Sequence, residues 1–82
     1  MDRVELVRLA GEQALLKKEI DELRAEQVRE AGLLRNLAAE SVRRGDWAAR
    51  THALVDRMAA RDDRIVQAQY QLAQYKERTG MD

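Results

Sequence analysis

The sequence predicts an all-α protein, an antiparallel two-helix coiled-coil hairpin that dimerises into a four-helix bundle. Charged residues make up 37% of the chain and proline is absent, a composition typical of long helices. Apolar residues recur at heptad spacing in both halves. One short stretch, 43–46, carries the stop and start signals of helices. The 82 residues are enough for one domain, with helices expected at 2–44 and 47–79.

The first expected helix, 2–44, carries an apolar seam. Alternating steps of three and four residues place its members on one stripe. They are Leu6, Leu9, Leu16, Ile20, Leu23, Leu34 and Leu37. A neighbouring row of small apolar residues widens this face towards that of a bundle: Val7, Ala10, Ala14, Val28, Ala31, Ala38 and Val42.

Two glycines, Gly11 and Gly32, fall at outward positions of this helix. Each costs about 1 kcal/mol relative to alanine inside a helix. Two interpretations stay open. Either both are tolerated on the exposed face, or one of them breaks the helix and the chain forms three helices.

The expected turn covers 43–46. Arg43 and Arg44 suit a helix C-terminus, and Gly45 suits the left-handed residue after it. Asp46 is expected to cap the next helix with its side chain. A helix running straight through would contain two consecutive three-residue seam steps, a stammer that overwinds a coiled coil. A fold-back avoids this strain, although a swapped dimer with a continuous helix stays open.

The second expected helix, 47–79, restores the heptad with a seam of its own: Trp47, Thr51, Leu54, Met58, Arg61, Ile65, Ala68, Leu72, Tyr75 and Thr79. Folding around Arg44 sets apolar seam residues level with apolar ones, for example Leu34 with Leu54. The polar seam residues Gln27, Glu30 and Arg61 then also meet. A shifted register would leave a buried charge without its partner. We therefore interpret this trio as a register-setting polar layer.

The expected tip of the hairpin is mildly basic and aromatic. Arg43, Arg44, Trp47 and Arg50 are the candidates for partner binding, because Arg and Trp are enriched at interaction hot spots. A simpler interpretation is that the arginines only stabilise the helix end and that the tryptophan packs over the end of the seam.

Catalytic and cofactor chemistry has little support. His52 is the single histidine and cysteine is absent, so we predict no catalytic residues, no metal site and no cofactor. No phosphate loop, zinc spacing or dinucleotide motif occurs. The formal net charge is zero, so the chain as a whole lacks the basic surface of a nucleic-acid binder.

The expected function is therefore that of a small non-enzymatic protein–protein interaction module: an adaptor, assembly factor or regulator. It would self-associate, most simply as a homodimer, and bind an unidentified protein partner. Two alternatives are a nucleic-acid-binding hairpin dimer and a purely structural oligomerisation or spacer element. No stretch resembles a signal peptide or a membrane-spanning helix, so we expect no membrane association and a cytoplasmic location.

Overall fold

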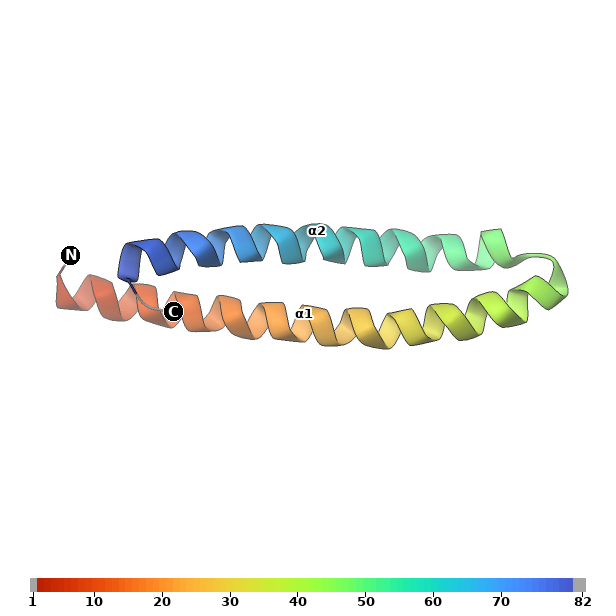
Figure 1. The fold of residues 1–82 in the computed structure, drawn as a ribbon, viewed down its shortest axis with the longest axis horizontal. Coiled ribbons are helices and arrows are strands. Elements are labelled where there is room, and N and C mark those ends of the chain that lie inside the picture. Colours follow the sequence, from red (N-terminus) through yellow and green to blue (C-terminus); the bar gives the residue numbers. More distant parts are fainter. Residues whose placement is uncertain (1, 81–82) are drawn as a thin grey trace.

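The structure, a computed structural model, describes residues 2–80 and consists of two long helices that pack against each other (Figure 1). Helix α1 spans Arg3–Arg44 and helix α2 spans Trp47–Thr79. The hairpin is 62 Å long with a cross-section of 15 × 14 Å. The predicted all-helical hairpin is confirmed, while the four-helix bundle of two hairpins stays a prediction.

Helix α1 begins at a capped end and runs without interruption. The Asp2 carboxylate accepts a hydrogen bond of 2.8 Å from the Glu5 amide, which satisfies one of the free amides of the first turn. Gly11 and Gly32 both lie inside α1. Neither breaks the helix, so the chain forms two helices and not three.

The fold-back is a Schellman motif centred on Gly45. Gly45 adopts a left-handed backbone with φ of 79°. Its amide donates to the Val42 carbonyl, and the Asp46 amide donates to the Ser41 carbonyl, each at 3.2 Å. These two bonds satisfy carbonyls that the helix end leaves free. The structure is thus a closed hairpin and not a straight helix.

Arg43 and Arg44 form the last turn of α1, where the expected helix 2–44 places them. One detail of the expected turn was wrong. Asp46 makes no side-chain capping bond to α2. The physical reason is that the Asp46 amide already closes the Schellman motif of α1. This leaves its backbone at φ −120° and ψ 22°, away from the extended conformation of a typical N-cap.

The core is one layer thick and lies along the seam between the helices. Its buried apolar residues are Leu9, Ile20, Leu54, Ile65 and Ala68. Polar residues are buried in the same seam: Gln13, Glu30, Ser41 and Thr51. Small domains bury a low fraction of their surface, and a core divided by polar residues adds less apolar burial still. Association with another chain would therefore add useful stability.

Gly32 lies inside a helix and Gly45 has a positive φ, so replacing each with alanine is expected to change the stability in opposite directions. A Cβ added at Gly32 meets no atom within 4 Å, so Gly32→Ala is expected to raise the free energy of unfolding by about 1 kcal/mol. Gly45→Ala, the matched control, is expected to lower it by about 1 kcal/mol, because a Cβ is strained at positive φ. Chemical denaturation measures both. Equal effects at the two positions would contradict the assigned turn.

Candidate functional site

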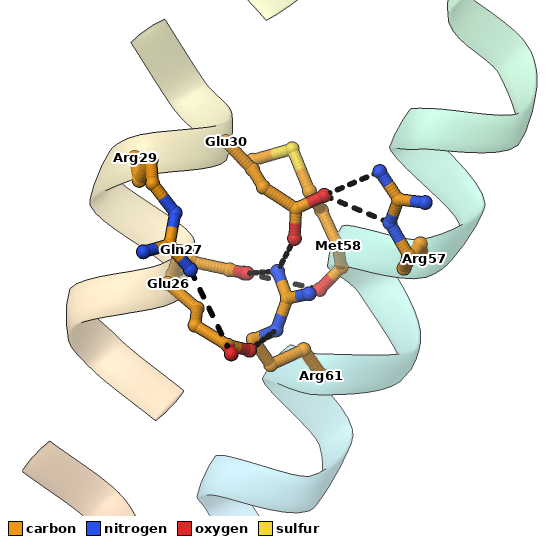
Figure 2. Close-up of polar contacts among 7 residues, drawn as sticks. All are labelled: Glu26, Gln27, Arg29, Glu30, Arg57, Met58 and Arg61. Carbon is orange, nitrogen blue, oxygen red and sulfur yellow. Dashed lines mark hydrogen bonds and ion pairs between the residues drawn. The ribbon is translucent and has the colours of Figure 1, made fainter. Parts of the chain in front are cut away.

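The most highly connected polar cluster lies near the middle of the hairpin, where Arg61 of α2 reaches across to α1 (Figure 2). Its Nη1 atom donates to the Gln27 Oε1 atom at 3.0 Å and also contacts Glu30. Its Nε atom lies 3.3 Å from a Glu26 carboxylate oxygen. The Arg61 side chain is only 12% exposed. The fold thus brings together Gln27, Glu30 and Arg61.

Glu30 is bound by two arginines although it is only 6% exposed. Arg57 approaches from the solvent side, with its Nε atom at 2.8 Å and its Nη2 atom at 2.7 Å from Glu30 Oε2. Burial by itself raises the pKa of the Glu30 carboxyl. The hydrogen bonds and positive charges of Arg57 and Arg61 together outweigh this, and the pKa is lowered from its usual value.

Gln27, the remaining member of this layer, also bonds to α2. The Gln27 side-chain amide donates to the Met58 carbonyl at 3.0 Å, which ties the two helices together at the same level. A carboxylate held ionised by two arginines is a poor general base, and the cluster contains no nucleophile. Its chemistry is that of a structural ion-pair network. Its role in fixing register stays a prediction.

A second charged feature follows one flank of the hairpin, and the sequence interpretation missed it. We define the charged ladder as the residues at heptad spacing on this flank: Glu5, Glu12, Glu19 and Glu26 on α1, with Arg57, Arg64 and Arg78 on α2. Arg64 binds Glu19 through two nitrogens at 2.7 and 2.8 Å. Arg78 lies 3.9 Å from Glu5. The signal was present in the sequence as acids and bases recurring every seven residues.

At the open end of the hairpin a tyrosine continues the ladder. Gln71 occupies the heptad position between Arg64 and Arg78. The Glu12 carboxylate instead accepts a hydrogen bond of 2.6 Å from the Tyr75 hydroxyl. This hydrogen bond, with a smaller contribution from burial, raises the pKa of Tyr75 above its ordinary value.

A groove of about 680 Å³ opens beside Tyr75. Glu12, Tyr75 and Arg78 are among the residues that line it. Glu12 is bonded to Tyr75, and Arg78 pairs with Glu5. Three of the polar groups that line the groove are thus engaged in contacts within the hairpin.

The four tip residues predicted to bind a partner lie at the turn end of the hairpin but differ in availability. Trp47 is 54% exposed, so much of its side chain stays open to solvent. Arg43 is exposed, whereas Arg44 pairs with Glu40 at 2.7 Å. Arg50 is half-buried and its Nη1 atom has no hydrogen-bond partner.

The opposite flank carries exposed valines. We define the apolar flank as the exposed valines on this side of the two helices, together with the exposed residues Ala14 and Ala59 between them. The valines are Val7, Val28, Val42, Val55 and Val66. Val28 stands two residues after the ladder residue Glu26, which corresponds to a rotation of about 200° around the helix. Val66 stands in the same relation to Arg64. The apolar flank therefore faces away from the charged ladder.

Comparison with known proteins gives no relative: no family model, no curated protein and no solved structure matches the chain. Within residues 2–80, no group of three His, Cys, Asp or Glu side chains is placed to hold a metal ion. Neither α1 nor α2 contains a segment long and apolar enough to cross a membrane. Residues 2–80 form a charged helical hairpin with ion pairs along one flank and exposed valines on the other.

Proposed function

We propose that the chain is a non-enzymatic helical interaction module that self-associates through the apolar flank and binds another protein at its tip. The observation that carries the proposal is the difference between the two flanks. One flank is closed by ion pairs between the helices. The other leaves Val28 and Val42 at 75% and 62% exposure.

The energetic argument starts from the valines. Burying apolar surface stabilises an association by about 25 cal/mol per Å², and contiguous exposed apolar surface is a usual mark of an interaction site. The small residues Ala14 and Ala59 stand between some of the valines, so a second helix could approach closely there. A hairpin with a single-layer core gains most from such a contact, because the contact gives it a second apolar layer.

The tip is the proposed site for a different protein. Trp47 offers a large exposed aromatic surface, and the Arg43 guanidinium near it in the sequence is also exposed. Residues of these two types often supply most of the energy of an interface. The tip lies at the end of the hairpin, so it stays accessible when the apolar flank is covered.

The nucleic-acid alternative is weaker in this geometry. Phosphate binding needs arginines and lysines free to replace counterions. Arg57, Arg61, Arg64 and Arg78 are instead held by carboxylates of α1. A purely structural spacer would not need an exposed tryptophan at its tip.

The proposal is tested by separating the two surfaces. Val28→Glu/Val55→Glu is expected to convert a dimer into a folded monomer, because both valines are exposed in the single hairpin and covered only by association. The tip variant Arg43→Ala/Arg44→Ala/Trp47→Ala is the control and is expected to keep the dimer mass while losing partner binding. Sedimentation equilibrium gives the mass, and circular dichroism gives the helix content.

The matched apolar-to-acid control is Leu15→Glu, because Leu15 is also exposed but does not belong to the apolar flank. It is expected to leave the dimer unchanged. A native chain that remains monomeric at about 100 μM would contradict self-association stronger than about 5.5 kcal/mol. Dissociation by Leu15→Glu as readily as by the flank variant would also contradict it.

A further inference from the structure

We propose that a second copy of this chain docks on the apolar flank with its tip pointing the opposite way, so that α1 packs against α1 of the partner. A two-fold axis would pass close to Val28. Asp21 would then lie opposite Arg35 of the partner subunit, and Arg35 opposite Asp21 of the partner subunit. This inference rests on the proposed function and adds the direction and the charge pairing of the association.

The pattern behind it is one heptad row of α1 on the apolar flank: Val7, Ala14, Asp21, Val28, Arg35 and Val42. Inverting this row about Val28 exchanges Asp21 with Arg35 and Ala14 with Val42. Between residues 14 and 42, apolar positions meet apolar positions and each charge meets its opposite, while Val7 has no counterpart on α1. A symmetric dimer requires a surface that is complementary to itself, and this row has that property for antiparallel helices.

The two charges in this row are available. Asp21 and Arg35 are both exposed, and within residues 2–80 neither forms an ion pair. On the opposite flank, by contrast, Glu19 and Arg64 already bind each other. Charges that the hairpin uses internally thus lie on one flank, while this self-complementary pair lies on the other.

Helix α2 carries a small residue at the level of the same axis. Gln27 contacts both Arg61 and the Met58 carbonyl, so residue 28 of α1 is level with roughly residue 59 of α2. Ala59, exposed and small, stands at that level. The flank runs along a hairpin that is 62 Å long and 15 Å wide. A surface of that length and width is comparable in area with the ~800 Å² that each partner of a standard interface covers.

The competing arrangement sets both tips at the same end, with α1 packed against α2 of the partner. In the observed register, Asp21 would then lie level with Val66 and Arg35 level with His52, so neither charge would gain an opposite partner. Arg24 and Asp62 are level in this register and would favour that arrangement. The two arrangements therefore respond to different charge changes.

The test uses Asp21→Arg and Arg35→Asp. In the proposed dimer each single variant places like charges opposite each other twice, so each is expected to weaken self-association at least about tenfold. In a mixed dimer the two introduced side chains face each other across the axis with opposite charges, and the unchanged Asp21 of one chain faces the unchanged Arg35 of the other. The mixture is therefore expected to form a heterodimer about as stable as the native homodimer. Native mass spectrometry of the mixture resolves the three species.

Glu22→Arg is the matched control, because it makes the same charge change one residue away and outside the apolar flank. It removes only an exposed 4.0 Å contact with Lys18 and is expected to leave the dimer unchanged. If the native chain dimerises and Val28→Glu/Val55→Glu dissociates it, but the charge variants have no effect, the antiparallel arrangement is overturned and the proposed function stands. If the native chain does not dimerise, both fail. Variants that unfold alone but form a folded heterodimer when mixed would still support the arrangement.

Discussion

Arg61→Leu is expected to lower the free energy of unfolding by about 3 kcal/mol, the lower end for breaking a buried ion pair. The variant leaves Glu30 buried with Arg57 alone, and it leaves the Gln27 side-chain carbonyl without its donor at 3.0 Å. The loss stays at the lower end because Arg57 continues to compensate the charge. Guanidinium denaturation of the native chain and of the variant measures the difference.

Two further variants make this prediction specific to the polar layer. Glu30→Leu/Arg61→Leu is expected to recover most of the stability, since replacing both members of a buried pair with apolar residues is often neutral or stabilising. Arg57→Leu is the control and is expected to cost less than Arg61→Leu, because the Arg57 side chain is 63% exposed. An Arg61→Leu variant with unchanged stability and unchanged oligomeric state would rule out a register-setting role for the layer.

The pH dependence of the free energy of unfolding provides an independent test of the same polar layer. The pKa of Glu30 is lowered in the folded chain from a usual value of 4.5. Its ion pairs therefore contribute stability above that pH, and this contribution is lost as the pH falls through the folded pKa. In Arg61→Leu the pKa of Glu30 is expected to rise, so this part of the acid dependence becomes smaller.

The sequence was sufficient to predict the fold because its local signals agree with one another. The heptad seam selects one face of each helix, and Gly45 marks the fold-back. The pairing of Gln27 and Glu30 with Arg61 followed from one assumption, that an antiparallel hairpin folds about Arg44. Once the axis of the fold-back is fixed, the register of every later layer is fixed with it.

The sequence interpretation failed where a residue had two possible roles. Asp46 is a good capping residue by type, but its amide closes the end of α1, and residue type alone does not decide between these uses. The charged ladder was missed for another reason. Glu19 and Arg64 were counted by segment and not by heptad position, and segment charge does not reveal which side of a helix carries it. Counting charges every seven residues would have identified the pair.

Glu19→Arg is expected to lower the free energy of unfolding by about 1.5 kcal/mol, from the lost pair and the repulsion of Arg64 by the new arginine. The pair is half-buried and bidentate, with both contacts under 2.9 Å, so its effect exceeds that of a fully exposed pair. Glu19→Arg/Arg64→Glu restores opposite charges across the same flank. It is expected to recover about 1 kcal/mol of the loss.

Glu22→Arg is again the matched control, since it changes the charge by the same amount outside the ladder. A double-mutant cycle in low and high salt measures the coupling, which should decrease as salt screens the partly exposed charges. If Glu19→Arg and Glu22→Arg have equal effects, or if the reversed pair recovers nothing, the ladder does not hold the helices together. The two flanks would then differ less than the structure indicates, and the proposed association through the apolar flank would lose the contrast on which it rests.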